Sequence, residues 1–167
     1  MGSDSQVHVS ASEEQCSVSL TRLLVGAWII RVEYLRNAWE VAFSLPENSA
    51  ALCSGIVAEL NDVVLNAEAD PDSNLQSDAE LAKALVLATL CTVQDVGVDN
   101  SSNLTFVFSN GAKVRFPGIA GPVDEVWSIY TPLAPGRRRQ FGEPAFVQSY
   151  FGDLSIDPMF AAFGAST

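Results

Sequence analysis

The sequence predicts an α+β protein that is predominantly β, and three observations lead to this expectation. Short stretches rich in β-branched and aromatic residues recur along the chain and are separated by polar turns. One segment has the pattern of a capped helix. Hydrophobic residues make up 48% of the 167 residues, which is enough to build a core. We expect two β-meander units, at about residues 22–66 and 77–131, joined by an acidic loop and one helix and forming one sheet or a small barrel.

The first unit begins with a strand over residues 27–34, whose β-branched and aromatic content is typical of strands. A turn at 36–37 follows, and residues 39–44 alternate apolar and polar side chains, as a half-buried strand does. Residues 50–65 are predicted as a third strand. The alternative is a helix, because apolar residues recur there at i, i+4 spacing, although Gly55 interrupts the run.

The link between the units is acidic and ends in the predicted helix. Residues 69–74 have the composition of a surface loop. Ser77 and Glu80 then form the pattern of a capping box, in which each side chain pairs with the other residue's backbone N–H. The Ala- and Leu-rich stretch that follows predicts a helix to about Leu90.

The second unit repeats the strand and turn pattern. Strands are predicted at 92–98, 104–109, 112–116 and 126–130, with a polar turn at 99–103. Asn110-Gly111 indicates a hairpin, because both residues tolerate positive φ.

The two ends of the chain differ from its middle. Residues 1–16 are polar and predict a loose N-terminal arm. Residues 132–167 form an aromatic-rich C-terminal extension with a short capped helix at 158–163, whose first position is Pro158. Its five phenylalanines predict that the extension packs on the domain or on a partner, including a second copy of the chain.

Three segments carry a resemblance to known proteins. They are Leu24-Val25-Gly26, the run from Leu104 to Gly111, and Glu125-Val126-Trp127. Over residues 22–130 the chain resembles an uncharacterised family of small β-rich bacterial proteins, common in actinobacteria. The resemblance implies a fold, and also a relation to the immunity proteins of bacterial toxin systems, among which such proteins sometimes sit.

The negative charge lies in the first part of the chain. Residues 1–100 contain fifteen acidic and four basic residues, whereas residues 101–167 contain five of each, and the formal net charge is −11. Such a field repels phosphate backbones and anionic lipid and attracts basic partners. We therefore expect no nucleic-acid or membrane binding. The alternative is that the acidity only keeps the protein soluble.

Residues for catalysis or metal binding are sparse. The single histidine, His8, lies in the polar arm, which is a poor place to hold a general base. Three widely spaced cysteines predict neither a disulfide framework nor a zinc site. The segment 70–74 only faintly matches a calcium loop. With no apolar leader or spanning segment in the sequence, we expect a cytosolic protein without a metal or cofactor, and not an enzyme.

The leading hypothesis is an acidic immunity protein that neutralises a basic toxin by protein–protein contact. Its candidate contact residues are carboxylates of the linker and of the last strand: Asp62, Glu68, Asp70, Asp72, Asp78, Glu80, Asp124 and Glu125. One alternative is a small-molecule-binding or enzymatic β-barrel whose cavity is lined by Trp28, Trp39 or Trp127. Another is a structural or assembly protein that uses its aromatic tail.

Overall fold

The computed structural model of the chain describes residues 9–35, 37–47, 62–68, 77–118, 125–131, 145–150 and 152–165. Its helices are α1 (Glu13–Leu24), α3 (Asp78–Ala88) and α4 (Pro158–Ala165). Its strands are β1 (Val9–Ser10), β2 (Trp28–Leu35), β3 (Ala38–Ser44), β4 (Asp62–Glu68), β5 (Val93–Val98), β6 (Leu104–Phe108), β7 (Lys113–Phe116), β8 (Glu125–Tyr130), β9 (Val147–Tyr150) and β10 (Asp153–Ile156).

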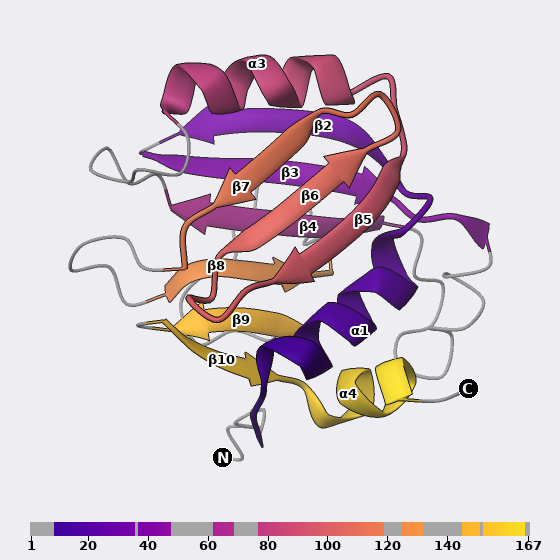
Figure 1. The fold of residues 1–167 in the computed structure, drawn as a ribbon, viewed down its shortest axis with the longest axis vertical. Helices are drawn as coiled ribbons and strands as arrows, with labels where there is room; N and C mark the ends of the chain where they lie inside the picture. Colours follow the sequence, from indigo (N-terminus) through magenta and orange to yellow (C-terminus); the bar gives the residue numbers. More distant parts are fainter. Residues whose placement is uncertain are drawn as a thin grey trace, which may run out of the picture.

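The strands form two antiparallel sheets that lie face to face (Figure 1). The larger sheet has the order β1-β10-β9-β8-β4-β3-β2, and the smaller has the order β5-β6-β7. The predicted α+β, mostly β class is therefore confirmed. The prediction that both meanders share one sheet or a small barrel is wrong, and the described strands close no barrel. Three strands of the second unit, β5 to β7, form their own sheet, which a bridge between Trp28 and Thr92 links to the first, whereas its fourth strand, β8, pairs with β4 in the larger sheet.

Alternating rows across the larger sheet explain how it packs. One transverse row is apolar and faces the smaller sheet, and it consists of Ile156, Val147, Ile129, Leu65, Val41 and Val32. The adjacent row points to the opposite face and is polar, and it consists of Ser155, Gln148, Ser128, Asn66, Glu40 and Glu33. Between the sheets, the ring of Phe43 stacks on that of Phe106 with their centroids 5.3 Å apart. The core thus lies between the two sheets.

Helix α1 covers the free edge of the smaller sheet. It begins with a capping box formed by Ser12 and Gln15, and it buries Leu20, Leu23 and Leu24 in the core. The Ser17 hydroxyl accepts the Val98 N–H at 2.9 Å, which satisfies a backbone donor at the edge of β5. The predicted loose arm is wrong for residues 9–16, since β1 pairs with β10 and the helix already begins at Glu13.

Helix α3 runs antiparallel to β2 along the other end of the sandwich (Figure 1). Asp78, in its first turn, contacts Tyr34 near the end of β2, and Thr92, just after the helix, pairs with Trp28 at the start of β2. The predicted capping box is present, with the Ser77 Oγ accepting the Glu80 N–H at 3.2 Å. The helix ends at Ala88, close to the predicted end.

The described part of the C-terminal segment belongs to the domain. β9 and β10, which the sequence analysis missed, extend the larger sheet beyond β8. The Asp157 carboxylate caps α4 by accepting the Met159 N–H at 2.8 Å, and Pro158 is the first helical residue as predicted. The ring of Phe160 is buried against Phe146. The structure therefore places residues 145–150 and 152–165 inside the fold, so these residues are not an extension separate from the domain as predicted.

The other strand predictions are confirmed for β2, β3 and β5 to β8. β4 confirms the strand predicted at 50–65 from residue 62 onward, whereas residues 50–61 lie outside the described part of the chain.

Candidate functional site

Charged side chains gather at the end of the larger sheet where the β2–β3 turn meets the start of α3. We call this region the acidic end, and its residues are Glu33, Glu40, Glu68, Asp78 and Glu80. The backbone explains the grouping, because Glu33 pairs directly with Glu40, and Glu68 pairs with Ala38 next to the turn. Glu33, Glu40 and Glu68 lie on the face of the sheet turned away from β5–β7, since Phe43 points to the other face.

Arg31 is the described base within the acidic end. Its guanidinium forms ion pairs of 2.7 Å with Glu40 and 3.0 Å with Glu33. The hydrogen bond that Arg31 donates to Glu40 outweighs the opposing effect of burial, so the pKa of Arg31 is raised above its ordinary value. This pairing explains why Glu33 and Glu40 tolerate positions directly opposite each other. Within the described part of the chain, the acidic end holds five carboxylates and the guanidinium of Arg31, and Arg36 lies outside that part.

Two aromatic rings lie beside these carboxylates. Tyr34 is 44% exposed, and its hydroxyl donates a 3.2 Å hydrogen bond to the Oδ2 of Asp78. Partial desolvation, and then the Asp78 charge, raise the pKa of Tyr34. Its ring lies against that of the buried Trp39, with the centroids 4.6 Å apart. Tyrosine is a residue type that protein interfaces favour, and here its exposed ring lies beside the Asp78 carboxylate.

The structure brings only some of the predicted contact residues together. Glu68, Asp78 and Glu80 lie at the acidic end, whereas Asp62 lies at the opposite end of β4, where it pairs with Ser44. Asp70, Asp72 and Asp124 lie outside the described residues, and Glu125 is the first residue of β8. The candidate calcium loop, the Arg137–Arg139 triplet and His8 also lie outside them.

Sequence reasoning missed Glu33, Glu40 and Tyr34. A signal for them was available: Glu33 and Glu40 are each three residues from the predicted turn at 36–37, so a two-residue hairpin pairs them. The total charge of the first hundred residues does not place individual carboxylates, whereas the register of the β2–β3 hairpin brings Glu33 and Glu40 together.

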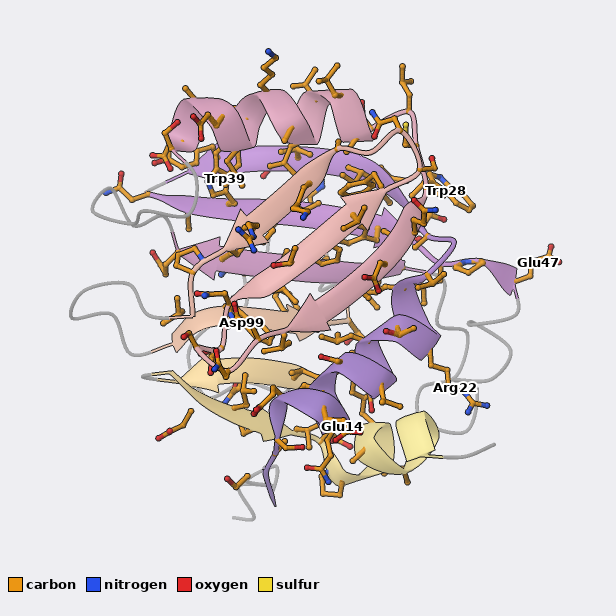
Figure 2. The ribbon with its side chains drawn as sticks, in the orientation of Figure 1. Glu14, Arg22, Trp28, Trp39, Glu47 and Asp99 are labelled. Carbon is orange, nitrogen blue, oxygen red and sulfur yellow. The ribbon has the colours of Figure 1, made fainter. Side chains whose placement is uncertain are left out.

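The remaining described carboxylates are spread over other surfaces. Glu13 and Glu14 begin α1, far from α3 (Figure 2), and Asp95 lies on β5. Asp99 has a local role, because its carboxylate accepts the N–H groups of Ser101 and Asn103 in the β5–β6 turn. Partial burial acts to raise its pKa, but hydrogen bonds from Asn103 and Ser101 hold the pKa of Asp99 below its ordinary value. The predicted single acidic region is therefore a local cluster accompanied by dispersed charge.

The three tryptophans do not line a common cavity. Trp127 is fully buried and hydrogen-bonded, Trp39 is buried against Tyr34, and Trp28 is partly exposed at the other end of β2 (Figure 2). Among the described residues, no group of three or more His, Cys, Asp or Glu is arranged to hold a metal ion. Within the same residues, the helices are too short or too polar to cross a membrane.

Comparisons with models of protein families, with curated proteins and with solved structures found no match for this chain.

Proposed function

We propose that the protein is a non-catalytic, acidic binding protein that recognises a basic protein surface, and specifically that it acts as an immunity protein neutralising a basic toxin. The observation that carries the proposal is the acidic end, where five carboxylates come from β2, β3, β4 and α3, and where the exposed ring of Tyr34 lies beside Asp78.

The charge of this surface supports fast association with a basic partner. Its carboxylates come from four elements of one rigid sandwich, so they keep their mutual arrangement when a partner approaches. Complementary charge raises association rates more than it raises final affinity, and salt suppresses the effect. This behaviour suits an inhibitor that must capture a toxin soon after synthesis.

The aromatic ring of Tyr34 adds an apolar contact to the charged surface of the acidic end. Tyrosine is enriched among residues that dominate binding energy, because a large rigid ring is desolvated at little cost in side-chain entropy. The hydrogen bond to Asp78 and the contact with Trp39 hold this ring in place before binding.

The test compares charge removal at the acidic end with the same removal elsewhere. Asp78→Asn with Glu80→Gln removes two charges but keeps hydrogen-bonding groups for Tyr34 and for the capping box. Asp95→Asn with Asp153→Asn is the matched control on other, exposed surfaces. The probes are purified basic nuclease-toxin domains and a fluorescent Lys- and Arg-rich peptide.

We expect the acidic-end variant to bind these probes at least about tenfold more weakly at low salt, a loss of about 1.4 kcal/mol. The control variant should bind within about twofold of wild type, and the difference should shrink at high salt. Equal losses in the two variants, or a failure of the wild type to bind or inhibit any toxin domain, would overturn the proposal.

A further inference from the structure

The end of the β2–α3 pair opposite the acidic end exposes large apolar side chains. We call it the apolar end, and its residues are Trp28 and Ile30 of β2 together with Val86, Leu87 and Leu90 of α3 and the turn after it. Leu90 is 93% exposed and Val86 is 68% exposed. Single exposed apolar residues are ordinary, but several at adjoining positions indicate an interface.

Backbone contacts place these residues together. Thr92 pairs with Trp28, and Leu90 precedes Thr92 by two residues. The Leu87 carbonyl accepts a hydrogen bond from the Asn110 side chain at 3.3 Å, which fixes the end of α3 on the β6–β7 turn. The start of β2 and the end of α3 therefore form one continuous region of the surface.

The charge pattern singles out this region in a strongly acidic chain. Residues 26–30 and 81–94, which build the apolar end, contain no acidic residue and one base, Lys83. Two copies of the chain that meet here bring no carboxylates of these segments together. α3 has 11 residues and is about 16 Å long, so a contact at its C-terminal half with the two helices pointing apart places their N-termini up to about 27 Å from each other. That separation exceeds the screening length of about 8 Å at physiological salt.

The exposed area is also of the size that self-association needs. Side chains of this size, at these exposures, present on the order of 100 Å² each, and with a polar rim they approach the roughly 800 Å² per partner of a standard interface. A two-fold axis near Leu87 makes the same residues meet their own copies, as an isologous contact requires.

We propose that the chain forms a two-fold symmetric dimer through the apolar end, with the C-terminal halves of the two α3 helices in contact. This surface differs from the C-terminal tail considered from the sequence, whose described rings Phe146 and Phe160 are buried in the chain's own core. The dimer carries one acidic end on each side and therefore presents two separated binding surfaces.

The test is sedimentation velocity of the full chain from about 1 µM to about 200 µM, a range that covers dimers of ordinary affinity. We expect the wild type to reach twice its 17.8 kDa mass. Leu87→Glu with Leu90→Glu should stay monomeric, with a dissociation constant raised at least about a hundredfold. Both side chains are exposed in one copy, so circular dichroism and Tm should change little.

The matched control is Val18→Glu with Met159→Glu, which adds the same charge at exposed apolar positions of α1 and α4. It should dimerise like the wild type. A wild type that is monomeric at the highest concentration overturns the proposal, and so does equal dissociation of the control, because then net charge rather than the apolar end governs association.

Discussion

The indole Nε1 of Trp127 donates a 2.9 Å hydrogen bond to the carbonyl oxygen of Ser102, and this contact ties the larger sheet to the β5–β6 turn of the smaller one. Two further bonds join the same region: Gly118 N donates to Asn103 Oδ1, and Ser149 Oγ donates to Gly118 O, each at 2.9 Å. We call these residues the inter-sheet cluster. The bonds of Trp127 and Ser149 are buried, so losing either one leaves a desolvated polar group.

Removing the indole N–H should therefore destabilise the fold. Trp127→Phe leaves the Ser102 carbonyl without this donor and also creates a small cavity. We expect the free energy of unfolding to fall by about 2–4 kcal/mol, measured by urea denaturation. Trp28→Phe, at a partly exposed position, should cost less than about 1 kcal/mol. Similar losses at the two positions would argue against a special role for the buried bond.

The second prediction concerns the crowding around Gly118. A Cβ at this position would collide with the backbone of Ser101 and Ser102. Gly118→Ala should cost at least about 2 kcal/mol, because backbone rather than a flexible side chain must move. Gly111→Ala is the comparison, since Gly111 has a φ of +84° but open space around it. Backbone strain alone should lower the stability of Gly111→Ala by about 1–2 kcal/mol. The melting temperatures of the two variants check this prediction, and a lower Tm for Gly111→Ala than for Gly118→Ala would contradict the crowding argument.

The third prediction tests how α1 protects the edge of β5. Ser17→Ala removes the oxygen that accepts the Val98 N–H and donates to the Val98 carbonyl. We expect a loss of about 1–2 kcal/mol in unfolding free energy. Hydrogen exchange at the Val98 amide should become at least about tenfold faster. Val18→Ala, at the neighbouring exposed position, serves as the control, and an unchanged Val98 exchange rate in Ser17→Ala would refute the edge role.

The fourth prediction follows from the buried thiol of Cys16. Burial, and then the charge of Glu13, raise the pKa of Cys16 from 9.0 to about 12. Above pH 9 the unfolded chain releases this proton while the folded chain keeps it, so stability falls as pH rises from 9 to about 12. Below pH 9 this thiol contributes no pH dependence.

The measurement is urea unfolding of the wild type and of Cys16→Ala between about pH 8 and about pH 11, a range that begins below the ordinary pKa of Cys in unfolded chains, about 8.5. The variant should be less stable at pH 8, because it leaves a small cavity, and should have a flatter alkaline limb. Parallel alkaline limbs in the two proteins would show that Cys16 is not responsible.

The sequence predicted most strands because their signals are local. The alternation at 39–44 and the Asn110-Gly111 turn depend on neighbouring residues alone, and both are found in the structure. The capping box at Ser77 was found for the same reason. The helix over Glu13–Leu24 was missed because the segment is polar, although Ser12 and Gln15 form a capping box like that of Ser77 and Glu80.

Long-range pairing explains the rest. Nothing local shows that β5–β7 form a separate sheet, or that β9 and β10 continue the first one. The same limit applies to the acidic end. Asp62, Glu68 and Asp78 were all predicted as contact residues, but Asp62 lies at the opposite end of the strand that it shares with Glu68 and is therefore not part of the acidic end. A carboxylate's position in the sequence predicts its strand, but strand register decides which charges become neighbours.

The contact between the first and last helices has a consequence for synthesis. Ser19 Oγ donates to the Phe160 carbonyl across 141 positions of sequence, and β1 pairs with β10 beside it. α1 packs on both β5 and α4, so it leaves the ribosome long before α4 exists, and the side of α1 that contacts α4 stays uncovered through translation of nearly the whole domain. Contacts between residues so far apart in the sequence slow folding, because the chain loses conformational entropy before these contacts form and stabilise it.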